Sequence, residues 1–171
     1  WWVFEPGEAD LQLTTVIPWI SSWGIHYAVG IDGISLFMVL LTSFITPITI
    51  LGSFNYIQKN ERAFYSLMLL LQGGVMGVFL ALDLFLFYIF WEVMLIPMYF
   101  IIGMWGGPRK LYAAIKFVLF TMFGSLLMLV AIIYILFEYQ KYSGEFSFDL
   151  LKLVNDLPLG YQAQLWLFGA F

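Results

Sequence analysis

The stretch from Ala63 to Trp105 is apolar almost throughout and contains only two charged residues, Asp83 and Glu92. A helix that crosses the hydrocarbon core of a bilayer needs about 20 consecutive apolar residues. The stretch is therefore long enough for two membrane helices joined by a tight turn at Asp83. Composition agrees, since 63% of the residues are hydrophobic and only 11% are charged. A soluble domain of this size could not bury so much apolar surface, which predicts a polytopic membrane protein.

Length and hydropathy predict four complete membrane spans and part of a fifth. The complete spans cover residues 34–54, 63–82, 84–105 and 111–137 of a transmembrane domain at 33–137, and the fifth begins in residues 161–171, near Gln164. The predicted fold class is therefore all-α, a polytopic transmembrane helix bundle. Because the chain begins at Trp1 rather than Met and ends in an apolar run, we expect an internal piece of a longer polypeptide.

Two segments lie outside these spans. Residues 1–32 are interrupted by prolines and glycines, and Ile25–Asp32 shows partial strand-like alternation. We expect an extramembrane loop or hairpin there. Residues 138–160 are predicted to form a second, polar loop that includes a short helix in Phe148–Val154.

Basic residues predict how the chain crosses the membrane. Lys and Arg concentrate in residues 55–62 and 106–110, whereas acidic residues outnumber basic ones in 138–160. Because basic loops remain on the cytoplasmic side, loops 55–62 and 106–110 are predicted to be cytoplasmic. Residues 1–32 and 138–160 are then predicted to face outward.

Glu92 is the only charge within the predicted span 84–105. A charged group at a helix centre costs roughly 2.5–3.5 kcal/mol on insertion scales, and such residues usually mark ion or proton paths. Pro97 strengthens this interpretation, because a proline leaves the carbonyl of Val93, four residues earlier, without its donor and kinks the helix. Water can lodge at such a site. We therefore predict that Glu92 carries protons; the alternative is a structural carboxyl paired with a neighbouring helix.

Lys116 lies in the next predicted span and is expected to be a second buried charge. On antiparallel helices its axial distance from Glu92 would be about 10 Å, too long for direct contact. A hydrated chain or a third residue could bridge that gap. We predict a role in proton transfer. The alternative is that the long side chain carries its ammonium to the cytoplasmic interface.

The other polar residues within or beside the spans have structural explanations. Asp83 and Asp32 are predicted to cap the helices that follow them, where the helix dipole favours a negative charge. Small and polar residues in the second span, at Gln72, Gly73, Gly74 and Gly77, are predicted to permit close helix packing.

Composition also excludes several kinds of site. The chain has no Cys, which excludes disulfides and cysteine-ligated iron–sulfur clusters. The single histidine, His26, is predicted to be exposed in a loop, and it cannot by itself form a zinc cage or a haem ligand pair. We therefore expect no metal site. Since basic residues do not cluster with aromatic ones, nucleic acid is not an expected partner.

Four motifs identify a family resemblance. They are GIDGISL at Gly30–Leu36, ALDLFLFYIFWEVMLIP at Ala81–Pro97, IGMWGGPRK at Ile102–Lys110 and YAAIKFVL at Tyr112–Leu119. Together they resemble the antiporter-like, proton-pumping subunits of respiratory complex I, the NADH:quinone oxidoreductase. Within that family the motifs are most similar to the branch of bacterial chain M and mitochondrial chain 4. The resemblance covers nearly all of the chain from about residue 25.

The resemblance implies an antiporter-like fold built from two inverted repeats, of which this chain would hold part of one. It implies that Glu92 matches the acid of the family's proton-transfer pair and that Lys116 matches a lysine on the following helix. The family's central lysine, the partner of the acid, would lie just beyond Phe171.

The resemblance further implies a proton-translocating subunit in the membrane arm of a translocase that couples quinone reduction to pumping. The chain itself would hold no cofactor; NAD, FMN, iron–sulfur clusters and quinone would belong to partner subunits. Its partners would be other membrane-arm subunits and the lipid bilayer. The expected location is the bacterial inner membrane, crossed several times.

Other functions remain open on the sequence alone. The same scaffold serves cation/proton antiporter complexes and membrane-bound hydrogenases. A purely structural membrane scaffold, in which Glu92 and Lys116 only lock helices together, is a third possibility. An ion channel ranks last, because the chain has no filter-like Gly-rich segment or carboxylate ring.

Overall fold

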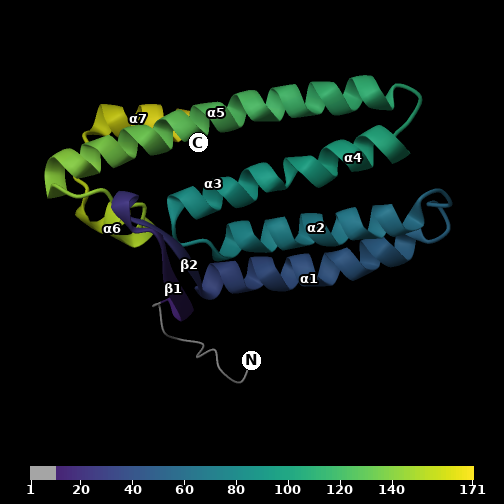
Figure 1. The fold of residues 1–171 in the computed structure, drawn as a ribbon, viewed down its shortest axis with the longest axis horizontal. Helices are drawn as coiled ribbons and strands as arrows, with labels where there is room; N and C mark the ends of the chain where they lie inside the picture. Colours follow the sequence, from purple (N-terminus) through teal and green to yellow (C-terminus); the bar gives the residue numbers. More distant parts are fainter. Residues whose placement is uncertain (1–10) are drawn as a thin grey trace.

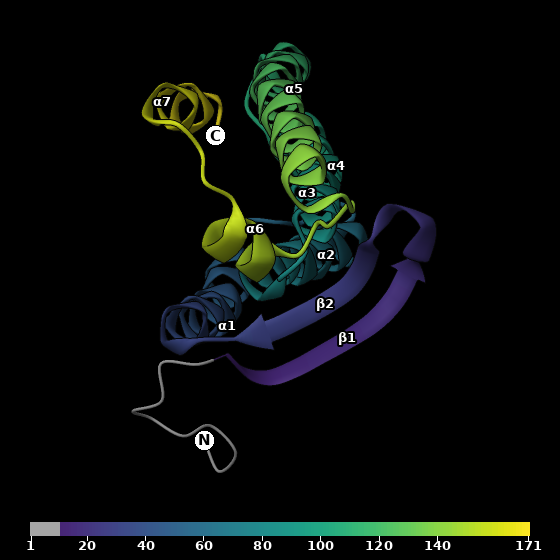
Figure 2. The same ribbon diagram turned by 90° about the vertical axis from the view of Figure 1, so that its left-hand side faces the viewer.

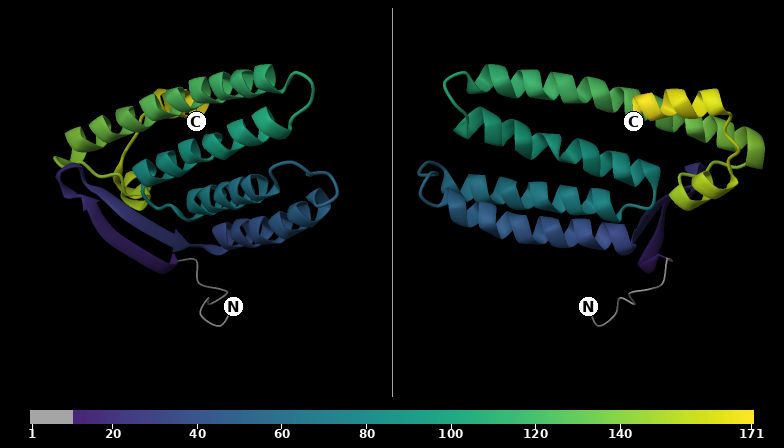
Figure 3. Two further views of the ribbon diagram at one scale, coloured as in Figure 1. Left: turned by 45° about the vertical axis from the view of Figure 1, so that its right-hand side comes forward. Right: turned by 180° about the vertical axis from the view of Figure 1, so that it is seen from behind.

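The computed structural model describes residues 11–171 and contains four apolar helical spans that run side by side (Figures 1 and 3). The spans are α1 (Gly33–Ser53), α2 (Glu61–Leu80), the pair α3 (Leu84–Val93) and α4 (Leu95–Trp105), and α5 (Lys110–Ser143). Each span packs against the next one along the chain. The prediction of a transmembrane helix bundle is confirmed.

A two-stranded hairpin precedes the first span. β1 (Gln12–Ile20) pairs antiparallel with β2 (Ile25–Ile31) through the short turn η1 (Ser21–Trp23). Gly24 closes this turn at φ 67°, and a Cβ there would lie 2.1 Å from the carbonyl oxygen of Phe146. Only glycine therefore fits where the hairpin meets the segment after α5. Residues 1–10, part of the segment predicted as a loop or hairpin, lie outside the described residues.

The hairpin corrects the prediction for His26. This residue lies within β2, where it is half-buried, rather than in an exposed loop. The reason is that the hairpin lies across the ends of the spans, as Figure 2 shows, so that one face of β2 is covered. Ala28 and Gly30, which alternate along β2 on the same face as His26, are buried.

The third span is broken in the middle. α3 ends at Val93 and α4 begins at Leu95, with Met94 between them. Pro97, three residues later, has no N–H to donate to the Val93 carbonyl. The predicted kink is confirmed, and it lies within two residues of Glu92.

α5 continues past the predicted end of its span at residue 137. It has 34 residues, about 50 Å of helix, and so exceeds a hydrocarbon core of about 30 Å. The extra turns are stabilised by an ion pair of 2.6 Å between Lys141 Nζ and Glu138 Oε1, and Gly144 ends the helix at φ 82°. Residues 138–160 are therefore only partly a loop: the prediction missed the last six residues of α5.

Two short helices follow α5. α6 (Leu150–Asp156) lies two residues later than the predicted helix in this loop, because Asp149 caps it by accepting hydrogen bonds from the N–H groups of Leu151 and Lys152. α7 (Tyr161–Ala170) begins three residues before Gln164 and contacts α5 (Figure 1).

The α1–α2 and α4–α5 loops lie at the end of the layer opposite the hairpin, whereas the α2–α3 turn lies at the hairpin end (Figure 1). At the former end the Trp105 indole donates a hydrogen bond of 2.8 Å to the Lys59 carbonyl, and its ring centroid lies 5.2 Å from that of Phe64. Loops 55–62 and 106–110 therefore share one end, as predicted. That this end is cytoplasmic stays a prediction.

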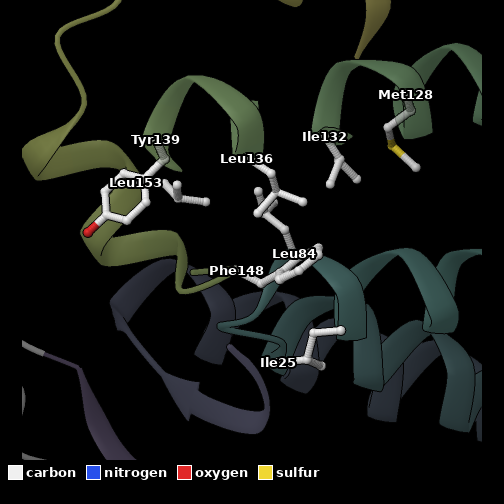
Figure 4. Close-up of a cluster of buried hydrophobic side chains, with 8 residues drawn as sticks. All are labelled: Ile25, Leu84, Met128, Ile132, Leu136, Tyr139, Phe148 and Leu153. Atoms are coloured by element: carbon white, nitrogen blue, oxygen red, sulfur yellow. The ribbon is translucent and has the colours of Figure 1, made fainter. Parts of the chain in front are cut away.

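The largest buried cluster lies at the hairpin end of the spans. Figure 4 shows its members, which come from β2, α3, α5, α6 and the segment before α6: Ile25, Leu84, Met128, Ile132, Leu136, Tyr139, Phe148 and Leu153. Elsewhere the spans expose large apolar side chains, such as Phe44 at 68% and Phe120 at 81%. Such surfaces suit a lipid environment rather than water.

Candidate functional site

Glu92 lies near the middle of the third span, on the last turn of α3. The residue is half-buried, and its Oε1 atom is buried without a hydrogen-bond partner among residues 11–171. Leaving a buried acceptor unsatisfied costs about 1–3 kcal/mol, and more when the group is charged. Glu92 is therefore held in a position that helix stability alone does not favour.

The backbone beside Glu92 is loosened by the break in the span. The Met94 N–H donates to the Phe90 carbonyl at 3.3 Å and the Met98 N–H to the Met94 carbonyl at 3.4 Å, both long for helical hydrogen bonds. Pro97 cannot supply a donor for Val93. A carboxyl group and weakly bonded carbonyls thus lie together within the membrane-spanning segment.

The Tyr88 hydroxyl lies near the Glu92 carboxyl. The Tyr88 side chain, one turn earlier on α3, interacts with both the Glu92 carboxyl and the Ser125 hydroxyl of α5. Ser125 is only 3% exposed and donates a hydrogen bond of 3.0 Å to the Met122 carbonyl. Neither residue was predicted from the sequence. The i, i+4 spacing of Tyr88 and Glu92, which places them on one helix face, was the available indication.

Glycines of α2 hold α3 and α4 close to that helix. A Cβ at Gly77 would lie 2.3 Å from Phe90 Cδ1, and one at Gly74 would lie 2.7 Å from Met94 Cγ. The predicted close packing is confirmed at these two positions. It is wrong for Gly73, where a Cβ would meet nothing within 4 Å.

Lys116 does not meet Glu92. Among the described residues the one ion pair is Lys141–Glu138, and the Lys116 side chain is exposed rather than buried as predicted. The cause is its position on the helix. Ala114, which is fully buried, faces Gly103 of α4, and two residues further along the direction has turned by about 200°.

The Lys116 ammonium instead lies 5.8 Å from the centroid of the Tyr112 ring, within cation–π range. It also lines a groove of about 650 Å³ formed by the α4–α5 loop and the first turns of α5. The structure thus places Tyr88 beside Glu92, and leaves Lys116 near the loop end of the bundle.

A second groove, of about 540 Å³, is lined by Ser125 and by Trp91, the residue before Glu92, but not by Glu92 itself. It lies between the third span, α5 and the end of α7, and Trp91, Met94, Thr121 and Ser125 are among its lining residues. Its lining is otherwise mostly apolar, and the Thr121 and Ser125 hydroxyls donate to backbone carbonyls of α5.

Asp83, at the start of the same span, is placed very differently. It is 1% exposed, and its Oδ1 accepts from the Phe85 and Leu86 N–H groups at 2.9 and 3.1 Å. Its Oδ2 accepts from the His26 N–H at 2.9 Å. The predicted N-cap is confirmed, and the bond to His26 adds a link to the hairpin. Asp32 likewise caps α1, in a reciprocal pair with Ser35, as predicted.

Clusters of three or more His, Cys, Asp or Glu that could hold a metal ion are absent from residues 11–171. Glu92 has the Tyr88 hydroxyl and weakly bonded backbone carbonyls nearby. A hydroxyl group both donates and accepts hydrogen bonds, so it suits either protonation state of the carboxyl.

Comparison with known proteins gives two family matches. Residues 81–171 match the family described as "NADH:quinone oxidoreductase/Mrp antiporter, TM", and residues 11–77 match "NADH-ubiquinone oxidoreductase chain 4, amino terminus". The first match includes Glu92, Ser125 and Lys116, and the second includes the hairpin and α1.

Curated relatives agree with these matches. NADH-quinone oxidoreductase subunit M of Rickettsia prowazekii (strain Madrid E) is 42% identical over 95% of this chain and 33% of its own length. NAD(P)H-quinone oxidoreductase chain 4 2 of Synechococcus sp. (strain JA-2-3B'a(2-13)) is 41% identical over 98% of this chain and 30% of its own. The chain thus spans about a third of the length of the curated relatives it matches.

A solved structure has the same arrangement of helices. A chain in the structure of respiratory complex I from Thermus thermophilus with bound NADH superposes with a TM-score of 0.78 and 30% sequence identity. The superposition covers 99% of this chain and 34% of the other.

Proposed function

Because this chain belongs to the NADH:quinone oxidoreductase/Mrp antiporter transmembrane family, we propose that it is a proton-translocating part of the membrane arm of respiratory complex I. The family description also includes antiporters, but the relatives named above are quinone oxidoreductase subunits. A cation/proton antiporter complex is therefore the second candidate, supported by the family description alone.

Glu92 is the group that carries the proton in this proposal. The observation behind it is the buried, unpartnered Oε1 in the middle of a span. Placing an ionisable group within a membrane span costs free energy, and such groups usually mark ion or proton paths. A charge that arrives or leaves nearby alters the relative stability of the ionised and neutral carboxyl, so that Glu92 takes up or releases a proton.

Lys116 is the second charge of the proposal and acts at a distance from Glu92. Its exposed ammonium and the groove around it place it toward the α4–α5 loop, with an axial separation of about 10 Å from the carboxyl. Water is required to connect the two groups. Lys116 would then exchange protons with the side of the membrane that carries loops 55–62 and 106–110, which we propose to be the cytoplasm.

The driving reaction belongs to other subunits in this proposal. Electrons would pass from NADH through FMN and iron–sulfur clusters to quinone elsewhere in the complex, and this chain would contribute only proton movement. Its surroundings would be lipid and neighbouring membrane-arm subunits, in a bacterial inner membrane.

The test is Glu92→Gln in the intact complex. Membrane vesicles are assayed for NADH-driven acidification, and NADH oxidation by an artificial acceptor reports on the part of the complex that does not involve quinone. We expect a loss of pumping on the order of 10²-fold, the scale of removing a proton-transfer group, with acceptor activity and assembly unchanged.

Glu138→Gln is the matched control. Glu138 lies at the exposed end of α5, where it pairs with Lys141, and loss of a surface ion pair has little effect. Normal pumping and normal quinone-linked turnover in Glu92→Gln would contradict the proposed function. Glu92 would then be a structural charge.

A further inference from the structure

We propose that the start of α5 is a binding site for a phospholipid with an anionic head group. The site is centred on a ridge formed by Tyr112, Lys116 and Phe120, which separates two grooves on the surface of the helix. Basic side chains at the α4–α5 loop hold the phosphate, and the two grooves hold the two acyl chains. This inference goes beyond the proposed function and does not depend on Glu92.

The ridge is one face of α5. Its three residues are four positions apart and therefore lie one above another along the helix. All three are exposed, Tyr112 at 62% and Phe120 at 81%. The helix begins at Lys110, and side chains on a helix tilt toward its N-terminus. The Lys116 ammonium accordingly points to the loop end of the bundle, where it lies 5.8 Å from the centroid of the Tyr112 ring.

A groove lies on each side of this ridge, and both grooves are lined by the ridge residues. The larger, of about 650 Å³, also includes Ala113 and Phe117, and the smaller, of about 450 Å³, includes Ile115 and Leu119. Because each residue turns the helix by about 100°, these two pairs lie on opposite sides of the ridge. Both volumes are within the range of about 300–1,000 Å³ that is usual for ligand sites.

Three cations line the larger groove where it meets the loop. They are Arg109, Lys110 and Lys116, and the lining of this groove includes no carboxylate. The one ion pair among residues 11–171 lies at the other end of α5. The Lys110 ammonium donates a hydrogen bond of 2.7 Å to the Met104 carbonyl and has two further hydrogens to donate. A negatively charged group with several acceptor oxygens complements this end of the groove.

A phospholipid matches the cations and the grooves at once. Its phosphate supplies the negative charge, and its acyl chains cover grooves whose lining beyond the cations is mostly apolar. The depth agrees, because Lys116 lies about 9 Å along the axis from the start of α5, and its long side chain carries the ammonium back toward the interface. Basic pockets between membrane helices bind anionic lipid head groups in this way. A free phosphate ion matches the cations but leaves the grooves uncovered.

The test is photo-crosslinking in the intact complex, held in nanodiscs of phosphatidylcholine. The probe is phosphatidylglycerol with a photoreactive group in one acyl chain, and its counterpart is phosphatidylcholine with the same labelled chain. Mass spectrometry identifies the labelled residues. We expect phosphatidylglycerol to label residues 115–123 of α5, and phosphatidylcholine to label them at least about fivefold less, the scale of one basic residue at an anionic membrane surface.

Two variants change the site in different ways. Arg109→Gln removes one cation and should lower labelling by phosphatidylglycerol about fivefold. Ala113→Leu retains every charge but fills the larger groove, and it should lower labelling at Phe117. Leu is a good helix former, so this variant keeps α5 intact. Lys116 is left unchanged because it also belongs to the proposed proton path.

Arg62→Gln is the matched control. Arg62 is also an exposed arginine at the loop end, but it lies at the start of α2 and lines neither groove. Its replacement removes the same charge from the same end of the bundle. Labelling of α5 should therefore be unchanged.

Selective labelling by phosphatidylglycerol that falls in Arg109→Gln and in Ala113→Leu, and persists in Arg62→Gln, supports the inference. Equal labelling by the two lipids would overturn it, because the grooves would then be ordinary lipid-facing surface. An equal loss in Arg62→Gln would overturn it as well, since charge at this end of the bundle would act without a site. Absence of lipid labelling on α5 would show that another protein segment covers the ridge, which also contradicts the inference. The pumping assay of Glu92→Gln tests the proposed function separately.

Discussion

Two carboxylates, one just before the third span and one within it, are in opposite situations. Asp83, the N-cap before Leu84, is 1% exposed and accepts three backbone N–H hydrogen bonds. Glu92, at the middle of the span, keeps one buried oxygen without a partner among residues 11–171. Burial is therefore common to both and does not distinguish a structural acid from a functional one. The difference lies in which groups satisfy the carboxylate, because a fully bonded charge stabilises one state whereas a partly bonded one can change state.

The partners of Asp83 also explain its structural role. Leu82 donates to Ala28 of β2 and Leu84 donates to Phe148, each at 2.9 Å, so the backbone on both sides of Asp83 joins the hairpin and the segment before α6. Asp83 adds the bond to His26. The N-cap thus fixes three segments at one point, next to the buried cluster of Figure 4.

Replacing Asp83 tests this comparison with the largest expected effect. Asp83→Ala leaves three backbone N–H groups without acceptors, each worth about 1 kcal/mol or more, and removes an N-cap. We expect a loss of about 3 kcal/mol or more in the free energy of unfolding. Thermal unfolding of the purified complex and the amount of assembled complex in membranes are the measurements.

Glu92→Gln is the counterpart in the same experiment. Because the Glu92 carboxyl makes few hydrogen bonds, its unfolding free energy should stay within about 1 kcal/mol of wild type. The comparison fails if Asp83→Ala assembles and melts as wild type does, or if Glu92→Gln is the less stable variant.

A smaller effect is expected where α2 holds the third span. Gly77→Ala would place a methyl group 2.3 Å from the Phe90 ring, so α3 must move, at a cost of about 1–3 kcal/mol. Since Phe90 lies two residues before Glu92, we also expect reduced pumping. Thermal unfolding and vesicle acidification measure the two effects.

Gly73→Ala provides the matched variant on the same helix. Its methyl group would meet nothing within 4 Å, and Ala favours a helix by about 1 kcal/mol over Gly. Equal or higher stability is therefore expected. Equal losses in both variants would show that helix conformation, and not contact with Phe90, decides the effect.

Hydropathy was sufficient to predict the spans, because each span is at least about as long as the bilayer requires and a charge or a turn marks its ends. The same property left the end of α5 undetected. Residues 138–143 contain Glu138 and Lys141, and the polar composition suggested a loop, although the ion pair between these residues extends the helix beyond the membrane. Hydropathy measures where a chain meets lipid and does not measure where a helix ends.

The site shows a similar limit. Glu92 and the break near Pro97 could be predicted because each is a local feature of one helix. Ser125 could not, since its relation to Glu92 depends on how α5 is rotated against α3. The same rotation explains the wrong prediction for Lys116: whether a residue is buried depends on which face of α5 meets α4, and the apolar residues around Lys116 do not specify that face.

The smallest expected effect concerns the two aspartate caps, whose pKa values move in opposite directions. The backbone N–H and the hydroxyl of Ser35 lower the pKa of Asp32 below its usual 3.8. Burial raises the pKa of Asp83 above 3.8, although the N–H groups of His26, Leu86 and Phe85 oppose that rise. The two caps should therefore respond oppositely to pH.

The signs follow from which state binds more protons. Folded Asp32 binds fewer protons than unfolded Asp32, so its contribution to stability is present above pH 3.8 and is lost as the pH falls through the lowered pKa. Folded Asp83 binds more protons than unfolded Asp83, so its contribution is present in full below pH 3.8 and declines as the pH rises through the raised pKa.

The melting temperature of wild type relative to Asp32→Asn should fall toward acid pH. The fall should be equivalent to less than about 1 kcal/mol, because the Asp32 carboxylate is partly exposed. The melting temperature of wild type relative to Asp83→Asn should instead fall as the pH rises from 3.8 through the raised pKa of Asp83, and level off above that pKa. Parallel pH dependence in the two variants would contradict the conclusion that burial, rather than capping, distinguishes the two aspartates.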